Sequence, residues 1–137
     1  MTSTVMYKGA LRTEMLHLQS NSLVETDAPT DNQGKGERFS PTDLVATALA
    51  SCMLTTMGIK VQLAGWDVDL TGTKAAVTKV MKAEPRRIAE IVINIVLPAS
   101  VNADAKQRAI LENTAKTCPV ERSLHPDLVV NVSFDWQ

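Results

Sequence analysis

The longest apolar pattern in the chain covers residues 40–59, which are apolar or small on nearly every helical face. No charged residue follows Asp43 within this range. Ser40 can cap a helix and Pro41 suits the first helical position, so the pattern predicts a helix that ends at about Leu63. A helix that is apolar all round lies inside a protein or a membrane. Because the uncharged run is shorter than the roughly 20 residues that a bilayer requires, we expect a central helix buried on all sides.

The residues before this helix alternate between apolar and polar side chains, a pattern typical of strands. Residues 4–18 predict two strands around a turn at Gly9-Ala10, and residues 23–26 predict a third short strand. Residues 27–37 are rich in turn-forming side chains and predict a loop. The first part of the chain is therefore expected to form three strands and a loop.

After the helix, residues 66–82 are rich in β-forming side chains, although the part from 74 to 82 would also fit a helix. Residues 88–97 are β-branched and apolar and predict a long strand, which forms a hairpin with the preceding segment. A second helix is expected from about 102 to 117, and residues 128–136 alternate as a closing strand.

This order of elements predicts an α+β fold with largely antiparallel sheets, and 137 residues fit one domain, residues 1–137. One chain of this length can hardly cover so apolar a helix on all sides. We therefore expect a homodimer whose sheets wrap the central helices. The net charge of −1 is evenly spread, which argues against nucleic-acid or membrane partners. The N-terminus lacks the apolar core of a signal peptide, so a cytoplasmic location is expected.

The chain has two cysteines, Cys52 and Cys118, too few for a disulfide scaffold and too far apart for a CxxC motif. With only His17 and His125 to add, a metal site is not expected. Cys52 lies in the apolar helix, where the first interpretation is structural packing. Cys118 directly precedes Pro119 at the start of a short helical turn, where exposed N–H groups favour a thiolate.

Together the two cysteines suggest a dithiol that folding brings together, with an attacking thiolate and a second thiol that resolves the oxidised intermediate. Burial in an apolar helix raises the pKa of a thiol, so Cys52 needs a nearby cation to ionise at neutral pH. No cation lies close to it on its own helix. By sequence alone the candidates are Arg12, Lys35 and Arg38.

Two motifs, SPTDLVATALASC at 40–52 and TCPVERSL at 117–124, resemble the organic hydroperoxide resistance and osmotically inducible protein C family (Ohr/OsmC), and residues 85–98 are consistent with it. The resemblance implies an OsmC-like α+β fold and an intertwined homodimer. It also implies a cysteine-based peroxidase of organic or inorganic hydroperoxides, with Cys52 as the peroxidatic and Cys118 as the resolving cysteine. The family uses no metal, haem or flavin, and its members are reduced by small dithiols or lipoyl-bearing proteins.

The chain departs from the family at Thr42, where peroxidases of the family usually carry a glutamate that pairs with an arginine beside the cysteine. Asp43 is a candidate for this acid partner, although its simpler role is to cap the helix. The matching arginine is Arg12 or Arg38. Glu14 would share a strand face with Arg12 and is a candidate to hold it.

These features lead to competing hypotheses. The first is a thiol-dependent peroxidase that acts in oxidative-stress defence through Cys52 and Cys118. The alternative, motivated by Thr42, is an OsmC-like protein that binds a small hydrophobic or thiol ligand in an apolar cavity without peroxidase turnover. In a third, both cysteines only pack and the protein has a role in assembly.

Overall fold

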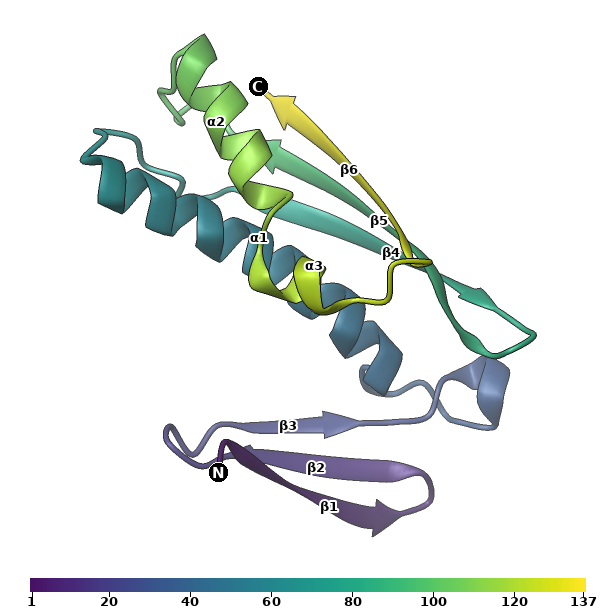
Figure 1. Cartoon of the computed structure of the whole chain (residues 1–137). Helices are drawn as coiled ribbons and strands as arrows, with labels where there is room; N and C mark the ends of the chain where they lie inside the picture. The colour runs from purple at the N-terminus through teal and green to yellow at the C-terminus, as the bar shows by residue number, and fades with distance from the viewer. The chain divides into compact units, whose positions relative to one another are not determined.

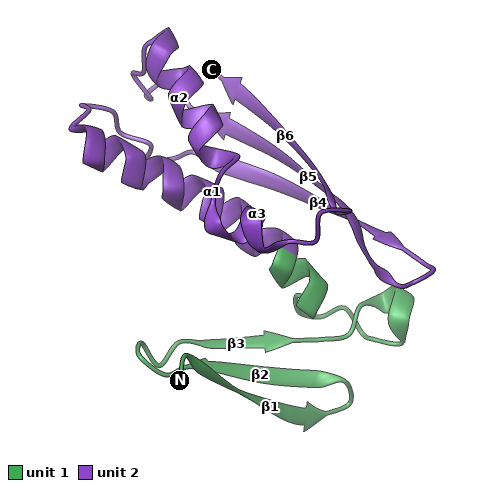
Figure 2. Ribbon diagram, in the orientation of Figure 1, with its two compact units in different colours: residues 1–45 green, residues 46–137 purple.

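The computed structural model describes residues 1–137 and contains two three-stranded sheets and three α-helices (Figure 1). The chain divides into two compact units, residues 1–45 and residues 46–137 (Figure 2). Each unit contains one of the sheets. The α+β fold that the order of elements predicts is therefore confirmed.

The N-terminal unit contains a sheet with the order β1 (Ser3–Gly9), β2 (Arg12–His17) and β3 (Leu23–Thr26), in which neighbouring strands are antiparallel. The β1–β2 turn at Ala10 and Leu11 has φ angles of 50° and 64°. Two left-handed residues in succession suit a two-residue hairpin because their twist matches that of the strands. All three predicted strands are confirmed.

The second sheet has the order β4, β5, β6 and belongs to the C-terminal unit. Its elements are β4 (Lys74–Lys82), β5 (Arg87–Leu97), α2 (Ala105–Ala115), α3 (Pro119–Ser123) and β6 (Val129–Trp136). The pair β4–β5 is the expected antiparallel hairpin, whereas β6 runs parallel to β5. A parallel partner requires a long crossover, which α2 and α3 supply.

The core of the C-terminal unit lies between this sheet and the helices on one of its faces. On β5, the residues Ile91, Ile93 and Ile95 are fully buried. From α1 (Pro41–Ala64), Leu49 and Met53 are also fully buried. Figure 1 shows α1 and α2 on the same side of the sheet. Burial of each such side chain contributes about 1.5–3 kcal/mol.

The prediction that α1 is buried on all sides is wrong for the single chain. Its buried residues follow one stripe: Ala46, Leu49, Ala50, Met53, Met57 and Val61. On the opposite side, Ile59 is 50% exposed and Leu63 is 81% exposed. One sheet covers only one side of a helix, so the remaining apolar side chains of α1 face outward.

By length and composition alone, α1 could cross a membrane, with a mean hydropathy of 1.6 over its most apolar window. The core helix of a soluble protein passes the same test. The contacts of α1 with the sheet account for the apolar stripe on its buried side.

The segment from 66 to 82 is a strand only in its second part. Residues 74–82 form β4, which resolves the helix-or-strand ambiguity, and residues 66–73 form no strand. Within the latter, Asp69 Oδ1 accepts a hydrogen bond from the Thr71 N–H at 2.9 Å, and Gly72 has a φ of 87°. Such a side-chain-to-backbone bond favours a turn over a strand, because it occupies a backbone donor.

The alternation of buried and exposed side chains along β5 predicts that alanine substitutions at the adjacent positions Val92 and Ile93 lower the free energy of unfolding by very different amounts. Ile93→Ala should lower the free energy of unfolding by about 2–5 kcal/mol, because it leaves a cavity in the core. Val92→Ala, on the other face, should lower it by about 1 kcal/mol or less. Urea unfolding of both variants checks this, and equal losses would contradict the assigned core face.

Candidate functional site

The structure brings the two predicted thiols together within the C-terminal unit. Cys52 lies on α1 and Cys118 immediately precedes α3, and the two thiols are close enough to interact electrostatically. Both are free thiols; Cys118 is fully buried and Cys52 is half-buried. Folding thus assembles a dithiol in which one sulfur is partly accessible and the other is covered.

Cys118 is the N-cap of α3, as its position before Pro119 predicts. Its Sγ accepts a hydrogen bond from the Glu121 N–H at 3.5 Å. Burial nevertheless raises the pKa of the Cys118 thiol, the Glu121 N–H counteracts this, and the neighbouring Cys52 raises it further. The net shift is upward, so desolvation outweighs the helix N–H groups that were expected to favour a thiolate at Cys118.

The first turn of α1 is closed by a reciprocal pair of hydrogen bonds. The Ser40 N–H donates to Asp43 Oδ2 at 2.8 Å, and the Asp43 N–H donates to Ser40 Oγ at 3.1 Å. This is the capping-box arrangement, and Asp43 thus has the capping role that its position predicts. Thr42 adds its hydroxyl, 3.1 Å from Ser40 Oγ. That Asp43 is also the acid partner of an arginine stays a prediction.

Arg12, on β2, is held by two carboxylates within the N-terminal unit. Its Nε and Nη2 donate to the two oxygens of Asp27 at 2.8 and 2.9 Å, and Nη2 also donates to Glu37 Oε2 at 2.8 Å. The Glu37 N–H donates to Asp27 Oδ2 at 3.1 Å. The hydrogen bonds to Asp27 raise the pKa of Arg12, and the same bonds lower the pKa of Asp27, whose side chain is only 5% exposed.

The prediction that Glu14 holds Arg12 is wrong. Glu14 instead lies 3.8 Å from Lys8 Nζ in a loose, partly exposed ion pair. The second candidate arginine, Arg38, is on the surface, where its Nε donates to Glu25 Oε2 at 3.0 Å. Of the two arginines, only Arg12 has a bidentate, largely buried carboxylate partner.

Sequence reasoning missed Asp27 and Glu37 as partners of Arg12. Both lie in the segment that the sequence predicts as a loop, and turn-forming residues do not specify which distant side chain a loop carboxylate meets. One signal in the sequence could have indicated these partners. Two acids stand at the ends of a loop whose glycines allow it to fold back on itself. Neither acid belongs to a periodic sequence pattern that would identify it as a partner of Arg12.

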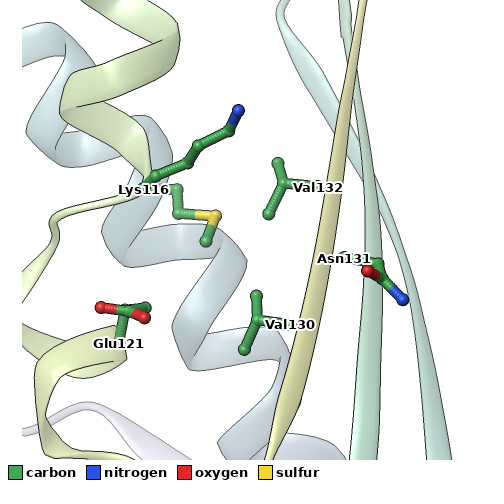
Figure 3. Close-up of a pocket in the computed structure, with 6 residues that line it drawn as sticks. Lys116, Glu121, Val130, Asn131 and Val132 are labelled. Atoms are coloured by element: carbon green, nitrogen blue, oxygen red, sulfur yellow. The ribbon is translucent and has the colours of Figure 1, made fainter.

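The C-terminal unit contains a pocket of about 350 Å³. Its lining includes Met53, which directly follows Cys52 in the chain, and Lys116, which lies two residues before Cys118. It is lined by Met53, Lys116, Glu121, Val130, Asn131 and Val132. Figure 3 shows Val130 and Val132 pointing from β6 toward the helices, whereas the Asn131 side chain points away. The pocket therefore combines an apolar wall with one cationic and one anionic side chain. No three histidine, cysteine or acidic side chains gather in a metal-binding cluster.

The family model described as OsmC-like protein matches residues 34–133 of the chain. No curated protein sequence matches. A solved structure from Psychrobacter arcticus 273-4, named provisionally for osmotic stress induction and detoxification response, is 54% identical in sequence. The match covers 98% of this chain and 95% of that one, with a TM-score of 0.89.

Two further solved structures share the fold at low sequence identity. An organic hydroperoxide resistance protein OsmC from Legionella pneumophila is 13% identical, with 98% of this chain and 97% of that one covered and a TM-score of 0.74. The organic hydroperoxide resistance protein OhrB of Bacillus subtilis is 14% identical, with 98% of each chain covered and a TM-score of 0.68. At these identities the likeness concerns the fold.

The Arg12–Asp27 pair predicts an acid-sensitive contribution to stability. Because folding lowers the pKa of Asp27, this contribution is present above the unfolded-state value of about 4 and is lost as the pH falls through the lower folded-state value. Asp27→Asn should therefore lower the melting temperature at pH 7, and the difference from wild type should shrink below about pH 4.

Thermal unfolding followed by circular dichroism between pH 7 and pH 3 checks this prediction. The matched control is Asp135→Asn, which changes an exposed aspartate on β6 and should alter the melting temperature little at pH 7. A difference between Asp27→Asn and wild type that stays constant over the whole range would contradict it.

Proposed function

Because the chain belongs to the OsmC-like protein family, we propose that it is a thiol-dependent peroxidase that reduces organic or inorganic hydroperoxides in oxidative-stress defence. The family, together with structural relatives named for osmotic stress and organic hydroperoxide resistance, supports a role in the stress response. The observation that carries the finer proposal is the electrostatic interaction that places the Cys52 and Cys118 thiols near one another.

In this proposal the Cys52 thiolate attacks the terminal oxygen of the hydroperoxide, the O–O bond breaks, and the alkoxide takes a proton and leaves as an alcohol. Cys52 is then a sulfenic acid. The Cys118 thiol attacks the sulfenic sulfur, water leaves, and a disulfide joins the two residues. An external dithiol or lipoyl-bearing protein reduces this disulfide and is itself oxidised, which restores both thiols.

The exposures of the two sulfurs support this division of roles. A peroxide must reach the attacking sulfur, and Cys52 is the half-buried one. A resolving thiol should remain protonated until the sulfenic acid forms beside it. Burial, which raises the pKa of Cys118, favours that protonated state at neutral pH.

For the cation that stabilises the thiolate and the departing alkoxide, we favour Arg12 over Arg38. Asp27 and Glu37 fix the guanidinium of Arg12 through Nε and Nη2, so that it is oriented before any anion arrives. Arg38 is half-exposed and has a single carboxylate contact. Arg12 thereby has carboxylate partners even though Thr42 occupies the position of the family's glutamate.

We also propose that the protein is a cytoplasmic homodimer. The exposed apolar side chains support the dimer. Ile59 and Leu63 of α1 face outward. In the N-terminal sheet, Val5 and Tyr7 are 64% and 65% exposed, and this unit contributes no residue to the buried core. A three-stranded sheet needs apolar cover for stability. A second copy of the chain would supply it.

A second candidate function is supported by the pocket of about 350 Å³ between α1, α3 and β6. Its apolar wall and its two opposite charges suit a small hydrophobic or thiol-containing ligand. In that case the protein would bind such a ligand without peroxidase turnover, and its two thiols would stay reduced after mild peroxide treatment.

The peroxidase proposal predicts consumption of cumene hydroperoxide or hydrogen peroxide with dithiothreitol as the reductant. Cys52→Ser should lower the rate to background, and Arg12→Ala should lower kcat/KM about 100-fold because a preorganised donor is lost. Arg38→Ala should change it little. Ser51→Ala, which alters an exposed neighbour on the same helix, is the matched control and should retain wild-type activity.

Mass spectrometry of the intact protein after one equivalent of peroxide separates the two candidate functions. A Cys52–Cys118 disulfide in wild type, and a stable sulfenic acid in Cys118→Ser, are expected for the peroxidase. If wild type and Cys52→Ser are equally inactive and both wild-type thiols stay reduced, the peroxidase assignment is wrong and the ligand-binding candidate replaces it.

The dimer proposal predicts a mass of twice 14.9 kDa by light scattering for the wild-type chain. Leu63→Glu should yield monomers, because a buried unpaired carboxylate is strongly unfavourable in an apolar interface. Asn113→Glu, an exposed position on α2, is the control and should remain dimeric. A wild-type monomer, or a Leu63→Glu variant that stays dimeric, would count against this interface.

A further inference from the structure

A second hollow, of about 220 Å³, lies wholly within the N-terminal unit. It is lined by Lys8, Gly9, Ala10, Arg12, Asp27 and Lys35. These residues come from the tip of the β1–β2 hairpin and from the loop of residues 27–37. The peroxidase chemistry proposed above uses neither Lys8 nor Lys35.

The charges that line this hollow are mainly positive. Its one acid, Asp27, has both oxygens occupied, Oδ1 by Arg12 Nε and Oδ2 by Arg12 Nη2 and the Glu37 N–H. Lys35 has no ion pair, and the contact of Lys8 with Glu14 is loose at 3.8 Å. Asp27 and Glu37 carry one negative charge more than Arg12 offsets, so the two lysines leave this group of five side chains with a net charge of +1.

The backbone of the loop determines where Lys35 lies. A side chain at Gly34 would place its Cβ 1.6 Å from the Ala28 carbonyl oxygen, and Gly36 has a φ of 65°. The Gly34 N–H donates to the Pro29 carbonyl at 2.9 Å, which folds the loop back on itself. The two glycines flanking Lys35 are therefore required for the loop path that brings its side chain to the hollow.

Arg12 also has hydrogen-bond donors that its two carboxylate partners do not use. Its contacts with Asp27 and Glu37 use Nε and Nη2, which leaves the Nη1 donors for another acceptor. A guanidinium and two ammonium groups around one hollow are the donors that carboxylate and phosphate oxygens prefer. A volume of 220 Å³ is several times the roughly 30 Å³ of a water molecule in the liquid.

From these observations we infer that the hollow of Lys8, Arg12 and Lys35 is a binding site for the carboxylate or phosphate group of a small anionic molecule. The oxygens of that group bind the two ammonium groups and Arg12 Nη1. The site shares Arg12 with the proposed thiol chemistry, but Lys8 and Lys35 have no part in that chemistry, and all lining residues lie in the N-terminal unit.

Nuclear magnetic resonance titrations of the ¹⁵N-labelled full chain test the site, with sodium phosphate and sodium acetate as separate probes at constant ionic strength. The amides of Gly9, Ala10 and Lys35 should shift in a saturable way. Tighter binding of phosphate would identify a phosphate-bearing ligand, and equal or tighter binding of acetate a carboxylate-bearing one.

Lys35→Gln should weaken binding roughly two- to five-fold, the range expected for one exposed charge pair. Because Lys35 is exposed, this variant should fold as wild type does. Lys74→Gln, which removes an exposed lysine from the other unit, is the matched control and should bind as wild type does. Shifts that never saturate, that chloride reproduces, or that Lys35→Gln leaves unchanged would overturn the proposal.

Discussion

The packing of α1 against β5 is the contact on which the candidate active site depends. Fully buried residues of the strand, such as Ile93, belong to the same apolar core as fully buried residues of the helix, such as Met53. Side chains in such a core are held in fixed positions because the interior is close-packed. Cys52 lies on this helix, one position before Met53, so the same packing that stabilises the C-terminal unit fixes the position of its sulfur.

Burial gives the two thiols different properties. Cys118 is fully covered, and desolvation raises the pKa of its thiol in spite of the helix N–H that its sulfur accepts. Its burial and the raised pKa suit a resolving cysteine, which stays protonated until its partner is oxidised to a sulfenic acid. Cys52 is partly accessible and suits the attacking role in the proposed reaction. The proposed chemistry thus depends on unequal solvation of two side chains of the same kind.

Charge in the N-terminal unit is concentrated around Arg12. Two carboxylates hold it, and two lysines line the hollow beside it. A guanidinium held by two acids is well oriented, but the two negative charges more than offset its single positive charge. Any anion that binds there therefore depends on the free donors of Arg12 and on the lysines. This distinguishes Arg12 from Arg38, which has one carboxylate partner and lies exposed on the surface.

The sequence by itself determined most of the strands, the helices and the Cys118 N-cap, because alternation, apolar runs and capping residues are local signals, but it left residues 74–82 open between helix and strand. The motifs around Cys52 and Cys118 also indicated the family. Only the tertiary structure decided that β6 lies parallel to β5, that α1 is covered on one side, and that Asp27 and Glu37 hold Arg12. These outcomes join residues far apart in the chain, and no local pattern encodes which distant partner a strand or a carboxylate meets.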